Sequence, residues 1–334
     1  MKIKSLYFLI FILLFSCSEN DEKESKNITT KPIENQVVKT ITLPDFNADS
    51  AYLYVKQQVD FGPRFPNNEA HAKCAEFLKN KLASFGLQTQ IQIGKTKTFN
   101  NKEIIIKNII GEYNPEAKKR ILLFAHWDSR PFADQDSKEM TKPILGANDG
   151  ASGVGVLLEV ARQLTLVKPE IGVDIIFFDA EDYGQPSSGM LIHQNTDSWC
   201  LGSQYWAKNL HKQNYKAEFG ILLDMVGSSN ILFTQESISM KYAPDVVRKV
   251  WNKASQIGYS KYFSQEQTFF VGTDDHKYVN EIARIPSIDI IHYERSTGNF
   301  HHSWHTHNDN MKVIDPNSLK IVGQTLLTVI YEEE

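Results

Sequence analysis

The sequence contains little cysteine and no excess of positive charge. Its 334 residues include three cysteines, none in a Cys-x-x-Cys or Cys/His finger spacing, at positions Cys17, Cys74 and Cys200. This count excludes a disulfide-stabilised scaffold and argues against a thiolate zinc site. We expect Cys74 and Cys200 to be buried small side chains or to form one disulfide. The formal net charge of -4 provides no basic surface, so nucleic acid is not an expected partner.

The one long apolar run lies at the N-terminus. Two lysines precede apolar residues 6–15, as in a secretory signal peptide, and the run is too short for a permanent membrane span. Residues 14–17 (Leu-Phe-Ser-Cys) resemble the lipobox of bacterial lipoproteins, in which the cysteine is acylated. We therefore expect a signal peptide over 1–17 and a lipid on Cys17. This lipid would anchor the protein to a membrane of the bacterial cell envelope, whereas a plain signal peptide is the alternative.

The next segment, residues 18–44, is rich in Glu, Lys, Asn, Ser and Thr and shows no apolar periodicity. A segment of this composition cannot bury a core, so we expect a flexible tether. From residue 45 to residue 334, helix-like and strand-like patterns alternate. This alternation predicts one α/β catalytic domain over 45–334.

The expected elements of this domain follow from apolar periodicity. Helical patterns occur over 49–60, 69–85, 150–165, 202–212, 242–257, 275–283 and 316–331. Strand-like runs occur over 88–94, 104–113, 120–125, 172–178, 218–223, 230–234 and 287–291. Several of these runs are apolar throughout, as in strands that helices cover on both faces. We therefore expect a three-layer α-β-α arrangement around a twisted, mostly parallel sheet with mixed edges.

Polar side chains gather where the predicted strands end. The residues that follow three of the strands are His126, Asp128, Glu181, Asp182 and Asp224. Asp149 stands just before a predicted helix, and His305 lies in the loop before the last helix. One carboxylate at a strand end usually caps a helix, but several together repel one another and need a cation or protons. Because carboxylate and imidazole suit zinc, and open α/β sheets bind ligands at this edge, the pattern indicates a zinc site.

Six short motifs occur in order along the chain. They are His-x-Asp at 126–128, Asn-Asp-Gly at 148–150, Asp-x-Glu-Asp at 179–182, Leu-Leu-Asp-Met-x-Gly at 222–227, Asp-His at 275–276 and Trp-His-Thr at 304–306. This succession resembles the co-catalytic zinc aminopeptidases and the glutaminyl cyclases that share their fold. The resemblance covers nearly the whole chain from residue 47 onward. It implies a phosphorylase/hydrolase-like α/β fold.

The resemblance also implies roles for the motif residues. One zinc ion would be held by Asp149, Asp182 and His305, although relatives commonly carry Glu where this chain has Asp182. Glu181 would be the general acid/base. In a peptidase, a second zinc ion would be held by His126 and Asp224, with Asp149 bridging. A cyclase needs one zinc ion, and Asp224 would then belong to a network of hydrogen-bonded carboxylates.

Two positions favour a cyclase over a peptidase. Asp274 stands before the Asp275-His276 pair, where peptidases usually carry a small residue and glutaminyl cyclases carry Asp. In a cyclase, Asp274 would join Glu181 and Asp224 around the substrate amine; its alternative role is to cap a helix. Trp304 is also typical of cyclases and would form a wall of the pocket, whereas core packing is its alternative role.

We therefore predict a zinc-dependent glutaminyl-peptide cyclotransferase, which converts the N-terminal Gln of peptides and proteins to pyroglutamate and releases ammonia. A zinc aminopeptidase with two metal ions is the alternative. A non-catalytic binding module is disfavoured because the chain keeps every expected ligand. The segment 129–147, which contains Asp134, is expected to be a lid or a solvated loop.

Overall fold

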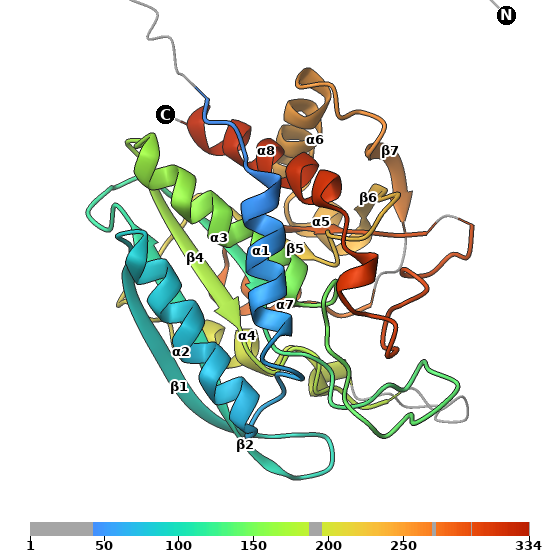
Figure 1. Ribbon diagram of the computed structural model, residues 1–334. Coiled ribbons are helices and arrows are strands. Elements are labelled where there is room, and N and C mark those ends of the chain that lie inside the picture. Colours follow the sequence, from blue (N-terminus) through green and yellow to red (C-terminus); the bar gives the residue numbers. More distant parts are fainter. Residues whose placement is uncertain (1–42, 187–195, 269–271, 295, 334) are drawn as a thin grey trace, which may run out of the picture. The chain divides into compact units, whose positions relative to one another are not determined.

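A computed structural model describes residues 43–186, 196–268, 272–294 and 296–333 (Figure 1). These residues belong to one folded unit, Ile41–Glu334. The expected signal peptide, Cys17 and nearly all of the expected tether lie outside the described residues. Among the described helices, none combines the length and the apolarity that crossing a bilayer requires.

A six-stranded sheet forms the centre of this unit. Its strands are β1 (Gln88–Lys97), β2 (Glu103–Tyr113), β3 (Arg120–His126), β4 (Gly172–Phe178), β5 (Gly220–Asp224) and β8 (Ser287–Ile291). Their order is β1-β2-β4-β3-β5-β8. The four strands β4, β3, β5 and β8 run parallel, whereas β1 and β2 add an antiparallel edge. The prediction of a mostly parallel sheet with a mixed edge is confirmed.

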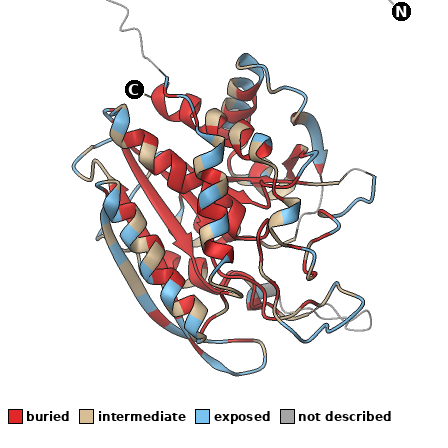
Figure 2. Cartoon of the chain, viewed as in Figure 1, coloured by how far each residue is buried: buried red, intermediate tan, exposed pale blue. Residues whose placement is uncertain are grey.

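Helices cover both faces of the sheet. One face carries α1 (Ala48–Val59), α2 (Glu69–Ser84), α3 (Ala151–Leu166), α6 (Pro244–Gln256) and α8 (Pro316–Tyr331). The other carries α4 (Leu201–Lys208) and the π-helical turn Val279–Ala283 that follows α7 (Asp275–Tyr278). Successive residues of a strand point to opposite faces, so Ile121 and Leu123 pack in the first layer and Leu122 and Phe124 in the second. Figure 2 shows β4 buried and the outer helices exposed along one side.

Short polar residues begin several of these helices. Asn47 accepts a hydrogen bond from the Ser50 amide, and Asn68 accepts one from the His71 amide. Such caps satisfy amides that have no partner inside the helix. The helix α8 begins with both an Asp315 cap and a proline at its first position.

The structure corrects several expected elements. The sequence interpretation missed α5 (Ser237–Tyr242) and β7 (Phe263–Thr268), and it placed β6 at 230–234 instead of Phe233–Glu236. The strands β6 and β7 pair in a separate two-stranded parallel sheet. Strand β7 has no alternating apolar pattern by which it could be predicted, because its middle residues are polar and exposed. The helix predicted over 202–212 ends at Lys208.

The two cysteines of the domain do not form the disulfide that the sequence analysis considered. Cys74 and Cys200 are both buried, and each is a free thiol.

Candidate active site

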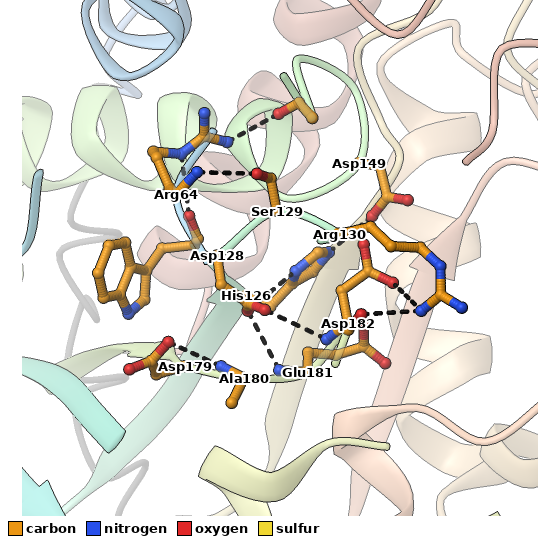
Figure 3. A network of polar contacts seen from close by, with 12 residues as sticks. Arg64, His126, Asp128, Ser129, Arg130, Asp149, Asp179, Ala180, Glu181 and Asp182 are labelled. Atoms are coloured by element: carbon orange, nitrogen blue, oxygen red, sulfur yellow. Dashed lines mark hydrogen bonds and ion pairs between the residues drawn. The ribbon is translucent and has the colours of Figure 1, made fainter. Parts of the chain in front are cut away.

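The candidate residues converge at the carboxyl edge of the parallel strands, where Figure 3 shows His126, Asp149, Glu181 and Asp182 close together. His126 is the last residue of β3, Asp224 is the last residue of β5, and Glu181 and Asp182 follow β4 by a tight turn. Asp149 precedes the first turn of α3. All five side chains are buried. The structure therefore brings together the residues that the strand-end pattern singled out.

Asp149 lies between two groups of potential metal ligands. Its Oδ1 is 3.1 Å from His126 Nε2, and its Oδ2 is 3.6 Å from His305 Nε2. His126 Nε2 is also 3.2 Å from Asp224 Oδ1, and His305 Nε2 is 3.1 Å from Asp182 Oδ1. In each group the donor atoms lie within 4.8 Å of one another. Both ligand sets expected from the sequence are therefore assembled, and they share Asp149.

The chemistry of the Asp149, Asp182 and His305 group fits a divalent cation. Asp149 Oδ2 and Asp182 Oδ2 are buried and lack a hydrogen-bond partner among the described residues. Burial, together with the neighbouring Asp149, raises the pKa of Asp182 to about 6. Carboxylate oxygens and imidazole nitrogens are ligands that zinc binds in proteins. A cation would relieve the repulsion between these carboxylates.

The loop that carries Asp149 is held by buried charged residues. The carboxylate of Asp309 accepts hydrogen bonds from the amides of Asn148 (2.8 Å) and Asp149 (3.0 Å). The buried Arg64 guanidinium donates to the carbonyls of Trp127, Leu145 and Gly146. These bonds hold the 145–149 segment against the end of β3 and so fix the position of the Asp149 carboxylate.

A glycine is required directly after Asp149. Gly150 has a φ of 93°, which is unfavourable for any residue with a side chain. A Cβ atom at this position would lie 2.6 Å from the Asp128 carbonyl and 3.0 Å from the ring of His126. In the Asn-Asp-Gly motif, Asp149 therefore provides a potential metal ligand, and Gly150 is required because a side chain does not fit.

Asp128 and Asp179 support the turn after β4. Asp128 accepts hydrogen bonds from the amides of Glu181 (3.1 Å) and Asp182 (3.2 Å), and Figure 3 shows both. Asp179 accepts a bond from the Lys107 amide and lies 2.8 Å from His71 Nε2. These two carboxylates orient the backbone that presents Glu181 and Asp182, and both are outside the two ligand groups.

A buried ion pair behind His305 was not found from the sequence. Arg130 donates to both oxygens of Asp134 at 2.6 and 2.9 Å, and to the Asp182 carbonyl at 2.8 Å. Asp134 Oδ1 is 3.2 Å from His305 Nδ1. Although burial acts to raise it, the hydrogen bonds from His305 and Arg130 hold the pKa of Asp134 below its usual value. The expectation of a solvated loop was therefore wrong for Asp134, whereas residues 137–142 of the segment are exposed. That the segment is a lid stays a prediction.

A cavity of about 320 Å³ opens beside the ligand groups. The proposed ligands Asp149, Asp182 and His305 lie in its lining, and three further carboxylates line it as well, those of Glu181, Asp224 and Asp274. Asp274 also caps α7, because its Oδ1 accepts a hydrogen bond of 2.6 Å from the Asp275 amide. The position of Asp274 is therefore compatible with both roles considered for it, contact with the substrate amine and capping of a helix.

Glu181 is buried at the edge of this cavity. Burial raises the pKa of its carboxyl well above the usual value, and the negative charges of Asp182 and Asp274 add to the effect. Cys200 Sγ lies 3.3 Å from Glu181 Oε1. A carboxyl group with a raised pKa can accept and return a proton near neutral pH.

Aromatic side chains form the opposite wall. The ring of Trp304 stacks on His305 with 3.8 Å between centroids, and Trp199 lies parallel to the same imidazole at 5.9 Å. Both tryptophans line the cavity with Ile291 and Phe300. Trp304 therefore lines the cavity and also packs against the small hydrophobic cluster of Met225 and Ile291, so both roles considered for it are compatible.

Comparison with known proteins places this site in a family. The sequence model of peptidase family M28 matches residues 108–330, about two thirds of the chain. The chain belongs to this family. Its match begins in β2 and ends in α8, so it includes all residues of both ligand groups.

Solved structures and curated relatives include both cyclases and peptidases. The chain is 53% identical to a glutaminyl cyclase of Bacteroides thetaiotaomicron, with a TM-score of 0.85 over 88% of this chain and 100% of that one. It is 52% identical to a leucine aminopeptidase precursor from the same organism, with a TM-score of 0.84 and the same coverage. It is 28% identical to an aminopeptidase of Bacillus subtilis over 71% of this chain, but it spans 46% of that protein's length. The expected fold and superfamily are confirmed.

Proposed function

We propose that the chain is a zinc-dependent glutaminyl-peptide cyclotransferase, which acts on the N-terminal Gln of peptides or proteins. The observation that carries this proposal is the Asp274 carboxylate in the cavity lining, which has an oxygen within 4.8 Å of an oxygen of Glu181. Glu181, Asp224 and Asp274, three carboxylates besides the proposed metal ligands Asp149 and Asp182, suit a substrate that presents a free amine. The 53% identity to a bacterial glutaminyl cyclase supports the same activity.

The metal would be held by Asp149, Asp182 and His305. Bound there, zinc supplies a Lewis acid that polarises the carbonyl of the substrate's γ-amide. One ion is sufficient for this reaction, because no water has to be activated. A neighbouring structure described as a Zn-dependent exopeptidase, 51% identical to this chain, supports zinc as the metal.

Glu181 would move the proton. The α-amine of the substrate attacks its own γ-amide carbon, a carbon–nitrogen bond forms, and the bond to the amide nitrogen breaks. Glu181 accepts a proton from the attacking amine and returns it to the departing nitrogen, which leaves as ammonia. Its raised pKa is suited to both steps.

Asp224 and Asp274 would orient the amine, and Trp304 would restrict the glutamine side chain. The reaction is intramolecular, so the rate depends on holding amine and amide close in one conformation. The stacked Trp304 and His305 rings place a flat wall beside the proposed metal ligands. Water has no required role in this step.

The second candidate function is a zinc aminopeptidase with two metal ions. The observation in its favour is the complete second ligand group, in which His126 Nε2 lies about equally far from Asp149 and Asp224. A zinc count distinguishes the two functions. The cyclase proposal expects about one zinc per chain in these two ligand groups, retained in His126→Ala and lost in His305→Ala. Two zinc ions, one lost in each variant, would favour the peptidase.

The direct test is a comparison of two peptides that differ in their first residue. Purified zinc-loaded protein should release ammonia from a Gln-initiated peptide and leave a Leu-initiated peptide intact. Hydrolysis of the Leu-initiated peptide without ammonia release would contradict the proposal.

We further propose that the protein is anchored to the bacterial cell envelope by a lipid on Cys17, through a tether over 18–44. The support is the sequence pattern alone, because these residues lie outside those described. Cys17→Ser should move the protein from the detergent phase to the soluble fraction, since loss of the acyl chains removes most of the membrane affinity. Unchanged partitioning of the variant would contradict the anchor.

A further inference from the structure

A second group of histidine and carboxylate side chains lies apart from the proposed zinc ligands. Its members are Glu294, His301 and His302, and their donor atoms lie within 4.8 Å of one another. The imidazole rings of His301 and His302 are 4.1 Å apart, and His302 Nδ1 is 3.8 Å from Glu294 Oε1. His301 is buried, whereas His302 is exposed and free to change its rotamer.

His301 is prepared to act as a metal ligand. Burial lowers the pKa of its imidazole, and the neighbouring His302 lowers it further. Its Nδ1 is 2.7 Å from the Ser303 hydroxyl oxygen and accepts a longer hydrogen bond of 3.3 Å from the Ser303 amide. When Nδ1–H instead donates to the hydroxyl along the shorter contact, the longer bond is lost and Nε2 keeps a free lone pair. Histidines that bind metals are commonly oriented by such a bond from their other ring nitrogen.

A third imidazole, that of His292, is close but has another partner. Its ring lies 6.0 Å from that of His301, and its Nδ1 accepts a hydrogen bond of 2.9 Å from the Leu232 amide. Nε2 therefore carries the proton of the neutral ring and offers no lone pair. Three protein ligands then remain, which leaves one position of a tetrahedral ion to water.

We infer that Glu294, His301 and His302 form an accessory site for a divalent transition-metal ion such as Zn²⁺, separate from the proposed catalytic site. Two imidazoles and one carboxylate are a ligand set that suits zinc better than calcium or magnesium. The exposed His302 has the freedom to close the set to bonding distances. This inference goes beyond the proposed function and does not depend on it.

The accessory ion would join two turns that form the cavity wall. The Glu294 amide donates to the Asn299 carbonyl at 2.8 Å, which closes one turn. The Trp304 amide donates to the His301 carbonyl at 2.8 Å, which closes the next. Asn299 and Trp304 both line the cavity. An ion bound between Glu294 and the two histidines would restrain these turns relative to each other.

The test is zinc binding by the holoenzyme at equilibrium. Wild-type protein dialysed against buffered Zn²⁺ should hold about one more ion per chain than His302→Ala, as counted by elemental analysis. His302 is exposed, so its removal should leave the fold intact, and Glu294→Gln should give the same loss. His307→Ala is the matched control, because His307 is a partly exposed histidine of the same loop that contacts Asp136 instead. It should bind as much zinc as the wild type.

The affinity and the stability provide independent readouts. His302→Ala should lower the affinity of the accessory site for zinc by about 100-fold or more. Loss of a hydrogen bond to a metal ligand typically costs about 10–100-fold in affinity, and loss of the ligand itself should cost more. Excess zinc should raise the melting temperature of the wild type and of His307→Ala above that of His302→Ala. Equal zinc counts in wild type and His302→Ala would overturn the inference. The zinc ion at the proposed catalytic site is lost in His305→Ala and not in His302→Ala. The two variants therefore distinguish failure of the accessory site from failure of the proposed function.

Discussion

At the scale of single residues, the site combines carboxylates that repel one another with a few groups that hold them in place. Asp149, Asp182 and Glu181 are buried within one small region, where their mutual repulsion is large. Arg130, Asp134 and the amides that bond to Asp128 fix their geometry. The reactive side chains therefore need little reorganisation when substrate binds.

Replacement of Glu181 by Gln tests the proton transfer. The amide has nearly the same size but cannot accept a proton, so the rate should fall by about 10²–10⁴. Zinc content should not change, because Glu181 is outside both ligand groups. Turnover and elemental analysis on the same preparation measure both quantities. A variant that keeps the wild-type rate would remove Glu181 from the mechanism.

Replacement of Asp134 by Asn tests the support of His305. The variant loses the negative charge 3.2 Å from His305 Nδ1, and zinc affinity should fall by about 10–100-fold. Asp136→Asn is the matched control, since Asp136 lies on the same loop and bonds to His307. Competition with a chelator measures the affinity. If both variants bind zinc equally well, Asp134 has no role in positioning the ligand.

At the scale of elements, the predicted structure was accurate where the apolar pattern was long and regular. The strands β3, β4 and β8 and the helices α2, α3 and α8 lie within one or two residues of the expected bounds. β7 and α5 were missed because one is polar and the other has six residues, too few for periodicity to show. The 202–212 pattern continued past the true end of α4 because a terminus depends on tertiary contacts that propensity does not encode.

The packing of α3 against the sheet is tested by Gly153→Ala. Gly to Ala within a helix usually stabilises by about 1 kcal/mol. Here the added Cβ atom would lie 2.3 Å from the Leu223 carbonyl oxygen, a backbone atom of β5 that cannot move freely because the strand is paired on both sides. The clash should dominate and lower the free energy of unfolding by about 1–3 kcal/mol.

Denaturant unfolding measures this effect. Ser255→Ala is the control, because Ser255 is an exposed residue of α6 and its replacement should change stability by less than about 0.5 kcal/mol. A Gly153→Ala variant as stable as the wild type would show that α3 can move away from β5.

At the scale of the whole molecule, the site depends on segments that are far apart in the sequence. The ligand His305, the supporting Asp309 and the loop of Asp134 meet only after the chain has folded. The proposed ligands could be identified from motifs because each motif is local and directly follows a strand or precedes a helix. The Arg130–Asp134 pair could not, because its role appears only when the 129–147 segment packs against the loop before α8.

The pH dependence of stability should change when zinc is removed. Burial raises the pKa of Asp182 to about 6 and those of Asp224 and Asp309 to about 7. In the metal-free protein the folded state then binds more protons than the unfolded chain between about pH 4 and pH 7. Its free energy of unfolding should therefore fall as the pH rises through this window.

Zinc favours the ionised carboxylates and should offset this loss. The rise in melting temperature caused by zinc should accordingly be larger at pH 8 than at pH 5, as measured by calorimetry on chelated and reloaded protein. An equal rise at both pH values would show that these buried acids do not titrate as described.

The central claim is that Asp149, Asp182 and His305 with Glu181 and Asp274 perform an intramolecular cyclisation. The most direct measurement is the mass of one Gln-initiated peptide after incubation with zinc-loaded wild type and with Asp274→Ser. We predict that wild type makes the intact peptide lighter by about 17 Da, the mass of ammonia, and that Asp274→Ser retains its zinc but loses most of this activity. Release of free glutamine and a peptide one residue shorter would contradict the account.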